Sequence, residues 1–283
     1  MIHVLCVATE NKGYLEFLEA SCDRYDVQLK KLKWGEPWKG YMDKIEAVIS
    51  YLKTLPSEDS VLFLDAYDTL LVRDPKTLGE VYSVDKIVVA VENVDSLSYS
   101  ASAARFGTID GELVNSGTYF GSVPSLRKAF TIMEKMLPKY NDDQLLFTDL
   151  IRENRDLFEL DTGRNLAAVC ADAEMRAAVK VDAGSQSVHF TYKQFNSAPF
   201  VLHYTYDGDM IPTLQALKYD FESLKHQQRK NYHFNLFLHH AESVMRSQWL
   251  WIIGCILVIL CLICIILFIR MKKGDPVRHV HWD

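Results

Sequence analysis

The stretch Val61-Leu62-Phe63-Leu64-Asp65-Ala66-Tyr67-Asp68 delivers two carboxylates directly after an unbroken apolar run. A continuous apolar run, in place of an alternating one, is typical of a strand that is covered on both faces. Ligand sites in open α/β sheets lie at the carboxyl ends of such strands. The stretch therefore predicts a buried strand that brings Asp65 and Asp68 to a binding site.

The two carboxylates suit a divalent cation. A cation that binds a nucleotide diphosphate needs hard oxygen ligands and free positions for phosphate oxygens, so Asp65 and Asp68 predict a site for Mn²⁺ or Mg²⁺. Two alternatives compete with this interpretation. The pair could end the strand as a turn with an Asp cap, and an apolar strand followed by Asp is also similar to phosphatases of the haloacid dehalogenase type. That family places its second Asp two residues after the first, where this chain has Tyr67.

Strand-like and helix-like segments alternate along the chain. This rhythm predicts an α/β domain with a mostly parallel central sheet and helices on both of its faces. Pro124 stands where proline suits the start of a helix. The expected helices are 14–25, 42–55, 125–136 and 143–153, and the expected strands are 2–8, 27–32, 61–64, 87–91, 117–123, 157–160 and 200–203.

The composition is that of an ordinary globular protein. The chain has 283 residues, a formal net charge of −6 and a pI near 5.9. An acidic chain without a clustered basic face does not suit phosphate backbones, so we expect no nucleic-acid partner. Outside the apolar run near the C-terminus, the cysteines are Cys6, Cys22 and Cys170. This odd and scattered set predicts no disulfide framework.

The apolar run near the C-terminus carries no charge between Arg246 and Arg270. At about 1.5 Å rise per residue, a helix over 247–269 is roughly 35 Å long, which is enough to cross a hydrocarbon core of about 30 Å. Trp249 and Trp251 at one end and basic residues at the other are typical of interfacial anchors. We therefore expect one C-terminal transmembrane helix that lies in the lipid bilayer.

The expected location is that of a single-pass, tail-anchored membrane protein. The first residues lack the charged start and the long apolar core of a secretory signal, and no Asn-x-Ser/Thr acceptor occurs in the sequence. Both features favour a large domain on the cytosolic side. The basic residues around 270–273 mildly oppose this orientation, so a lumenal domain stays an alternative. The expected parts are the α/β domain at 1–216, a linker or amphipathic helix at 217–246, the transmembrane helix at 247–269 and a short basic tail at 270–283.

A series of short motifs runs in order through the α/β domain. The motifs are Val7-Ala8-Thr9, Gly13-Tyr14-Leu15, Gly35-Glu36-Pro37-Trp38, Lys44, Asp65-Ala66-Tyr67-Asp68, Val91-Glu92, Asn115-Ser116-Gly117, Asp142-Asp143-Gln144, Leu160-Asp161 and Val201-Leu202-His203. In this order they resemble the glycosyltransferase domain of procollagen lysyl hydroxylases and the related procollagen galactosyltransferases. The resemblance covers roughly residues 2–206. Each motif is short, but so many matches in order are not expected by chance.

The resemblance implies a GT-A type nucleotide-sugar domain with Mn²⁺ as the metal and a UDP-sugar as the donor. Asp65, Asp68 and His203 match the metal ligands of the family, and Mn²⁺ accepts an imidazole alongside carboxylates. The residues that match donor-binding positions are Thr9, Trp38, Lys44, Tyr67, Asn115 and Ser116. The residues that match the acidic groups near the sugar, and that we expect to take part in catalysis, are Glu92, Asp142 and Asp143.

Each of these side chains also has a purely structural interpretation. A lone His203 could be a packed or capping histidine, Trp38 a core aromatic and Lys44 a solvated helix residue. The sequence Asn115-Ser116-Gly117 could be a tight turn before a strand. Asp142 and its neighbour could be a helix cap and a carboxylate favoured by the helix dipole.

The sequence departs from the family pattern in two places. After the metal histidine the family has Gly-Asn-Gly and then a Lys that can meet the diphosphate, whereas this chain continues Tyr204-Thr205-Tyr206-Asp207-Gly208-Asp209. An aromatic residue that follows the family's Glu is also missing after Glu92. The departures predict a changed diphosphate contact and a changed acceptor.

The sequence thus predicts a membrane-anchored, metal-dependent glycosyltransferase that moves a sugar from a UDP-sugar to an acceptor hydroxyl. We expect the acceptor to be a glycan, a lipid or a protein. The alternative is a catalytically silent GT-A-like binding or scaffold protein, which the changed segment after His203 favours. The clustered carboxylates count against that alternative, because a fold kept only for binding does not need them.

Overall fold

The structure is a computed structural model that describes residues 1–92, 97–205, 208–220, 256 and 258–260. Contacts divide the chain into two compact units, Met1–Tyr232 and His233–Asp283. The sheets and the site described below belong to the first unit, and the described residues of the second are helical.

The predicted C-terminal segments fall almost entirely outside the described residues. The linker at 217–246, the transmembrane helix at 247–269 and the tail at 270–283 are described only at 217–220, 256 and 258–260. Among the residues that the structure does describe, no helix is long and apolar enough to cross a bilayer.

The first unit alternates strands with helices, as the sequence predicts. Every expected strand and helix has a counterpart whose ends differ by a few residues, whereas β4, β8–β11, α3, α4, α7 and α8 were not expected. The strands are β1 Ile2–Val7, β2 Leu29–Leu32, β3 Ser60–Leu64, β4 Thr69–Leu71, β5 Ile87–Glu92, β6 Leu113–Ser122, β7 Phe158–Leu160, β8 Ala167–Val169, β9 Val179–Val181, β10 Val188–Tyr192, β11 Phe195–Ser197 and β12 Val201–His203. The helices are α1 Leu15–Asp23, α2 Tyr41–Leu52, α3 Leu78–Val81, α4 Leu97–Phe106, α5 Val123–Met136, α6 Asp143–Glu153, α7 Ala173–Ala178 and α8 Ile211–Ala216, with short 3₁₀ turns at Pro75–Thr77, Leu137–Lys139 and Arg155–Leu157.

The central sheet has six strands in the order β2-β1-β3-β6-β5-β7. The pairs β1–β2, β1–β3 and β5–β7 are parallel, but β6 is antiparallel to both β3 and β5. Five of the six strands therefore point the same way, so the sheet is mostly parallel, as predicted, with β6 as an antiparallel exception that makes it mixed. The reason is the connection: residues 93–112 lead from the carboxyl end of β5 straight into β6, which enters the sheet from that same edge.

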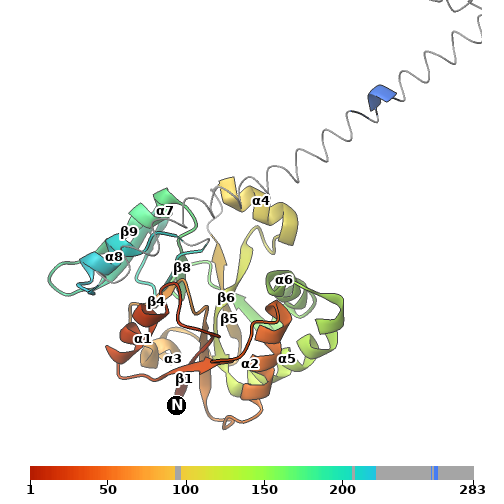
Figure 1. The fold of residues 1–283 in the computed structure, drawn as a ribbon, viewed down its shortest axis with the longest axis horizontal. Helices are drawn as coiled ribbons and strands as arrows, with labels where there is room; N and C mark the ends of the chain where they lie inside the picture. The colour runs from red at the N-terminus through yellow and green to blue at the C-terminus, as the bar shows by residue number, and fades with distance from the viewer. Residues whose placement is uncertain (93–96, 206–207, 221–255, 257, 261–283) are drawn as a thin grey trace, which may run out of the picture. The chain divides into compact units, whose positions relative to one another are not determined.

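Each face of the central sheet is covered, which explains the continuous apolar run of β3. Val61 and Phe63 pack with α2, α5 and α6 on one face. Leu62 and Leu64 pack on the other face with α1, α3 and the strands of a second sheet. Figure 1 shows α2, α5 and α6 together on one side of the sheet and α1 and α3 on the other. Burial of each such side chain contributes roughly 1.5–3 kcal/mol to folding.

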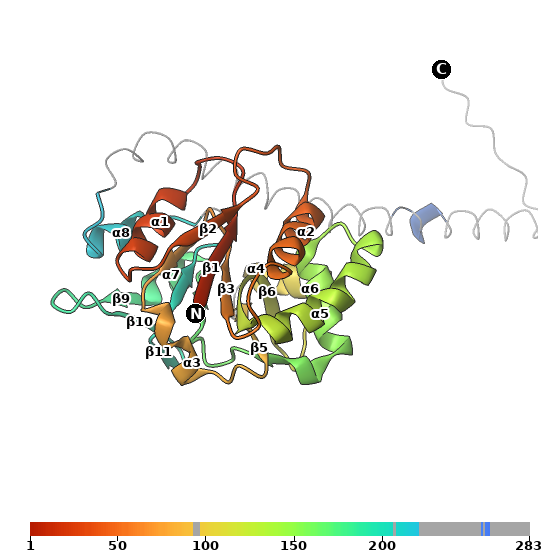
Figure 2. The ribbon, with the colours of Figure 1, turned by 90° about the horizontal axis from the view of Figure 1, so that it is seen from below.

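Two small sheets complete the unit. The sheet β4-β12-β8 packs on the central sheet, and β11-β10-β9 lies farther out with α7 and α8 (Figure 2). Strand β12 is antiparallel to β4 and parallel to β8, so His203 lies opposite Thr69 at the start of β4. This pairing returns a late segment of the chain to the end of β3. The cysteines Cys6, Cys22 and Cys170 are buried and unbonded, as predicted.

Candidate active site

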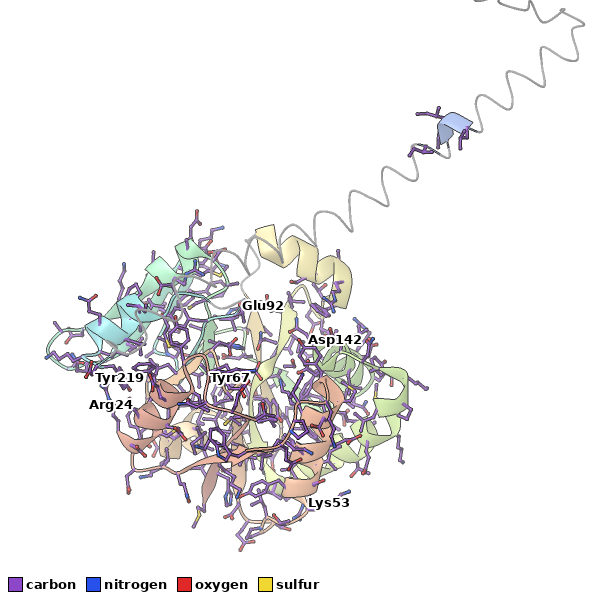
Figure 3. All side chains as sticks on the ribbon, in the orientation of Figure 1. Arg24, Lys53, Tyr67, Glu92, Asp142 and Tyr219 are labelled. Atoms are coloured by element: carbon purple, nitrogen blue, oxygen red, sulfur yellow. The ribbon has the colours of Figure 1, made fainter. Side chains whose placement is uncertain are left out.

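The candidate site lies where several strands of the central sheet end together. Because β6 runs against both of its neighbours, β3 and β5 point the same way, and β1 is parallel to β3. Thr9 after β1, Asp65 after β3 and Glu92 at the end of β5 therefore share one edge. In Figure 3 the labelled side chains Tyr67 and Glu92 come from the β3–β4 loop and from the end of β5. This is the edge at which open α/β sheets bind ligands.

The structure brings Asp65, Asp68 and His203 together. One ligand atom from each of the three side chains lies within 4.8 Å of the other two. The loop that carries the carboxylates is tied at three points. The Asp65 N–H donates to the Gly117 carbonyl at 2.7 Å, the Thr69 hydroxyl donates to the Asp65 carbonyl at 2.5 Å, and the Tyr204 N–H donates to the Asp68 carbonyl at 2.7 Å. The positions of the two carboxylates are thus set by backbone contacts from distant segments.

Gly117 makes room for this cluster. A Cβ atom at residue 117 would collide with Asp65 Oδ2 and His203 Cε1. The pairing of β5 with β6 is also irregular here, because Val89 lies opposite Tyr119 while Val91 lies opposite Val114. Such bulges re-aim side chains next to active sites. The interpretation of Asn115-Ser116-Gly117 as a turn before a strand is wrong, since these residues lie inside β6.

The His203 imidazole is buried with only 1% of its surface exposed. Its Nε2 atom lies 3.3 Å from Asp68 Oδ2 and 3.9 Å from Asp65 Oδ2. Within the described part of the chain, neither ring nitrogen has a partner with the alignment of a hydrogen bond. Burial disfavours the imidazolium, but the nearby carboxylates of Asp68 and Asp65 outweigh burial and raise the pKa of His203. A buried imidazole aimed at two carboxylates without a hydrogen bond is the donor set that a divalent cation binds.

Lys44 is a buried bridge between two carboxylates. Its Nζ atom lies 2.7 Å from Asp65 Oδ1 and 2.7 Å from Asp143 Oδ2. The Ser116 hydroxyl donates to the same Asp143 oxygen at 3.0 Å. Burial disfavours the ammonium, yet the two carboxylates raise the pKa of Lys44 and keep it charged. The alternative of a solvated helix residue is wrong, because 7% of Lys44 is exposed.

Glu92 lies at the end of β5 and is 3% exposed. The Asn115 amide donates to its Oε1 atom at 3.4 Å, and the Arg164 guanidinium donates to its backbone carbonyl at 3.1 Å. Burial raises the pKa of the Glu92 carboxyl. A buried carboxyl with a raised pKa, held at a sheet edge by two partners, is typical of a functional group.

Asp142 is the N-cap of α6, so its capping interpretation is confirmed. Its Oδ1 atom accepts hydrogen bonds from the N–H groups of Gln144 and Leu145, both at 3.1 Å. Its Oδ2 atom lies 2.7 Å from the Arg105 guanidinium of α4. Asp143 differs from its neighbour, because it is buried in the first turn of α6 and faces Lys44. The structure therefore joins Asp143, but not Asp142, to Asp65 through Lys44.

Tyr67 lies between Asp65 and Asp68 in the β3–β4 loop, and the β1–α1 loop holds it in place. The Thr9 N–H donates to the Tyr67 hydroxyl at 2.9 Å, and the Tyr14 N–H donates to the Tyr67 carbonyl at 2.9 Å. Trp38 is 48% exposed, and its ring packs edge-on to Tyr41 with 5.9 Å between the ring centroids. The alternative of Trp38 as a core aromatic is wrong.

Two cations of the site were not foreseen. Arg105 reaches Asp142 from α4, and Arg164, which is fully buried, reaches the carbonyl of Glu92 and the carboxylate of Glu112. Both partners are distant in the sequence, and an arginine carries no local pattern that reveals such contacts. Arg164 lies three residues after the Leu160-Asp161 motif, and this closeness is the one sequence feature that points to a place near the site.

Comparison with known proteins gives a family match over most of the chain. The family described as the PLOD GT domain matches residues 1–219. The multifunctional procollagen lysine hydroxylase and glycosyltransferase of Caenorhabditis elegans is 26% identical over 226 residues, which are 71% of this chain and 30% of that protein. The procollagen-lysine,2-oxoglutarate 5-dioxygenase of Drosophila melanogaster is 26% identical over 231 residues, again 71% of this chain and 30% of that protein. The chain thus spans 30% of the length of these curated relatives.

Two solved structures share a similar arrangement at low identity. A glycosyltransferase involved in the glycosylation of the major capsid of PBCV-1 is 11% identical with a TM-score of 0.41, and the match covers 59% of this chain and 84% of that chain. The galactosyltransferase LgtC in complex with donor and acceptor sugar analogs is 13% identical with a TM-score of 0.45, and the match covers 72% of this chain and 87% of that chain.

Proposed function

The chain belongs to the PLOD GT domain family, as its motifs predicted, and on that premise we propose that it is a metal-dependent glycosyltransferase. The reaction moves a sugar from a UDP-sugar to an acceptor hydroxyl. The observation that supports this proposal most is the convergence of Asp65, Asp68 and the unpartnered imidazole of His203 at the carboxyl edge of the sheet. A structural histidine in that position would have a hydrogen-bond partner.

The residues that would hold the metal are Asp65, Asp68 and His203. Two carboxylates and one imidazole suit Mn²⁺ better than Mg²⁺, which prefers oxygen ligands alone. When bound, the cation supplies a Lewis acid that neutralises charge on the departing UDP. Both carboxylates are partly exposed, with 33% and 23% of their side chains open to solvent, so they face a space that a diphosphate can enter.

Lys44 and Asp143 would orient the donor sugar. The Lys44 ammonium pairs with both Asp65 and Asp143, and it joins the proposed metal position to the start of α6. The Asp143 carboxylate and the Ser116 hydroxyl form a polar pair to which sugar hydroxyls can hydrogen-bond. A preorganised network of this kind holds its geometry without reorganising during the reaction.

Glu92 is the carboxylate best suited to take the proton from the acceptor hydroxyl. Its raised pKa brings it closer to working pH than an exposed carboxylate, which is what a general base needs. Asp142 has one oxygen committed to the helix cap and shares the other with Arg105, so its proposed role is to position hydroxyls at the rim.

The nucleotide would lie along the β1–α1 loop. Tyr67 offers an aromatic ring to the base or ribose, and Thr9 and Asn115 supply polar groups nearby. Trp38 lies on an exposed loop and could close over the donor only by changing its contact with Tyr41. These assignments follow the motif positions and are proposals for this chain.

The acceptor and the membrane anchor are part of the same proposal. The names of the curated relatives include lysine hydroxylation, but this chain spans 30% of their length, and we propose only glycosyl transfer to a glycan, lipid or protein. We also propose that the apolar run 247–269 anchors the chain in a membrane with the large domain on the cytosolic side. Protease digestion of sealed vesicles tests this orientation: cleavage of the domain without detergent supports it, and full protection contradicts it.

The proposed reaction is tested by hydrolysis of the donor. The full chain in detergent is incubated with a panel of UDP-sugars and Mn²⁺, and release of UDP is measured, because transferases of this class leak some sugar to water. We expect metal-dependent release from one donor and its loss in Asp65→Asn. The matched control is Asp26→Asn, the same chemical change at an exposed residue beyond α1.

The control separates a lost site from a lost fold. Equal release by the wild type and by Asp26→Asn, with none from Asp65→Asn, supports the transferase. Absence of both UDP release and UDP binding in the folded wild type contradicts it and favours the scaffold alternative.

A further inference from the structure

The candidate site is rich in carboxylates, and the cations that touch them are already engaged. Lys44 is held between Asp65 and Asp143. Arg105 is held by Asp142, and Arg164 is held by Glu112 and backbone carbonyls. The diphosphate of a UDP-sugar carries two negative charges, which one divalent cation offsets, but the UDP that departs carries up to three. The departing UDP therefore gains from a further cation that can exchange its present partner for phosphate.

The segment after His203 does not supply that cation. It continues Tyr204-Thr205-Tyr206-Asp207-Gly208-Asp209, in which the only charged residues are acidic. In the structure Asp209 is exposed and accepts a hydrogen bond from the Ile211 N–H at 3.0 Å. Like charges repel, so carboxylates in this segment do not help to bind a diphosphate.

Lys12 lies in the β1–α1 loop, which contacts Tyr67 of the β3–β4 loop. Its Nζ atom lies 4.7 Å from the centre of the Tyr67 ring, and Tyr67 separates the two metal carboxylates in the β3–β4 loop. The side chain of Lys12 is 51% exposed. Its ion partner is Glu10 at 3.1 Å, which is 64% exposed itself. Such an exposed pair is weak and exchanges easily for a more highly charged anion.

The backbone that carries Lys12 is fixed against Tyr67. Thr9 donates to the Tyr67 hydroxyl, and Tyr14 donates to the Tyr67 carbonyl. Between them, Gly13 has a φ of +58°, and a Cβ atom there would approach the Tyr67 carbonyl oxygen to 2.6 Å. The loop thus holds Lys12 beside the metal carboxylates, while its long side chain stays free to turn.

We propose that Lys12 binds the diphosphate of the UDP-sugar, an inference that rests on the proposed function of the site. The ammonium leaves Glu10 and takes a phosphate oxygen, as a compact point charge with three donors can do from a flexible stem. The cation for the diphosphate then comes from the β1–α1 loop and not from the segment after His203.

The test compares UDP with uridine, which lacks the diphosphate. Binding of each ligand to the full chain in detergent with Mn²⁺ is measured by calorimetry for the wild type, Lys12→Met and Lys12→Arg. The matched control is Lys53→Met, since Lys53 also lies in an exposed ion pair, with Glu134 at 3.2 Å, at the far end of α2 from Lys44. Figure 3 shows Lys53 well away from Tyr67.

We expect Lys12→Met to weaken UDP binding roughly tenfold, as loss of one charge-assisted contact at a partly exposed site does. Uridine binding should change by less than about twofold, Lys12→Arg should retain most of the UDP affinity, and Lys53→Met should match the wild type. Unchanged UDP binding in Lys12→Met, beside metal-dependent binding in the wild type, overturns the role of Lys12 and leaves the proposed function standing. Equal losses for UDP and uridine also overturn it, because Lys12 would then act through Tyr67. A folded wild type that binds no UDP overturns both proposals.

Discussion

Two carboxylate sites in this domain differ in how many of their buried polar atoms have hydrogen-bond partners. Asp161, in the turn after β7, accepts hydrogen bonds from the Tyr82 hydroxyl and from the N–H groups of three following residues, at 2.8–3.0 Å. The cluster of Asp65, Asp68 and His203 is different, because the two carboxylates face a histidine whose ring nitrogens lack hydrogen bonds in the described structure. Each site joins the central sheet to the β4-β12-β8 sheet, so their positions do not explain the difference.

The difference separates a carboxylate that builds the fold from carboxylates that await a ligand. A buried polar group without a partner costs free energy, so it persists where something outside the chain completes it. Asp161 has its partners within the chain and anchors the turn that leads into β8. At the other site Asp65 is paired with Lys44 through one oxygen, but the ring nitrogens of His203 have no hydrogen-bond partner in the described structure. Substitutions at the two sites should therefore affect different properties.

The largest effect is expected from Asp161→Ala. Loss of the carboxylate leaves several buried N–H groups and the Tyr82 hydroxyl without an acceptor, which should lower the free energy of unfolding by roughly 3–5 kcal/mol. Urea unfolding followed by circular dichroism measures this. A decrease of less than about 1 kcal/mol in the free energy of unfolding would contradict a structural role for Asp161.

The pH dependence of stability should report Asp161 next. Burial raises its pKa to about 6, against about 4 in an unfolded chain. The folded state then binds more protons between these values, so this group makes the free energy of unfolding fall as the pH rises from about 4 to about 6, by up to about 3 kcal/mol. Urea unfolding at several pH values should show that the wild type loses this much relative to Asp161→Asn. Parallel curves for the two proteins would contradict the raised pKa.

Asp68→Asn should spare the fold and remove activity. We expect metal-dependent UDP release to fall roughly 100-fold, the size of effect that follows loss of a charged group aligned on the reacting centre. The free energy of unfolding should change by less than about 1 kcal/mol, because relief of repulsion from Asp65 offsets the lost attraction to His203. Parallel unfolding and activity assays measure both quantities. A large loss of stability would place Asp68 with Asp161 as a structural group.

Gly117→Ala should have the smallest of these effects. The added methyl group must push Asp65 or His203 aside, so we expect roughly tenfold weaker Mn²⁺ binding, since shifted ligands lose part of their coordination. Gly79→Ala is the matched control, because no atom lies within 4 Å of a Cβ atom at residue 79 in α3. Calorimetric titration of Mn²⁺ into both variants makes the comparison. Equal Mn²⁺ affinities of the two variants would show that metal binding does not depend on the space at Gly117.

The sequence predicts the long elements of the fold and misses the direction of β6. Runs such as Val61–Leu64 have enough pattern to identify a buried strand, and Pro124 marks the start of α5. The direction of β6 depends on where residues 93–112 enter the sheet, which no local pattern encodes. Strands of three residues, such as β4 and β8, are too short to show a periodic pattern of apolar residues in the sequence.

The sequence predicted the residues of the candidate site but not the ion pairs and hydrogen bonds that connect them. Asp65, Asp68 and His203 were expected from the motifs, and the structure brings them together. Lys44 was expected at the nucleotide, yet it bridges residues 21 and 99 positions away. Contacts over such separations depend on tertiary packing of α2 against β3 and α6. For the same reason the links from Arg105 and Arg164 could not be foreseen.

The central claim is that Asp65, Asp68 and His203 form one metal centre, and anomalous diffraction from crystals grown with Mn²⁺ and UDP tests it most directly. We predict one manganese peak with Asp65 and Asp68 carboxylate oxygens and His203 Nε2 within roughly 2.0–2.6 Å of it. A manganese peak elsewhere in the domain, or bound UDP with no manganese at these three residues, would contradict the account.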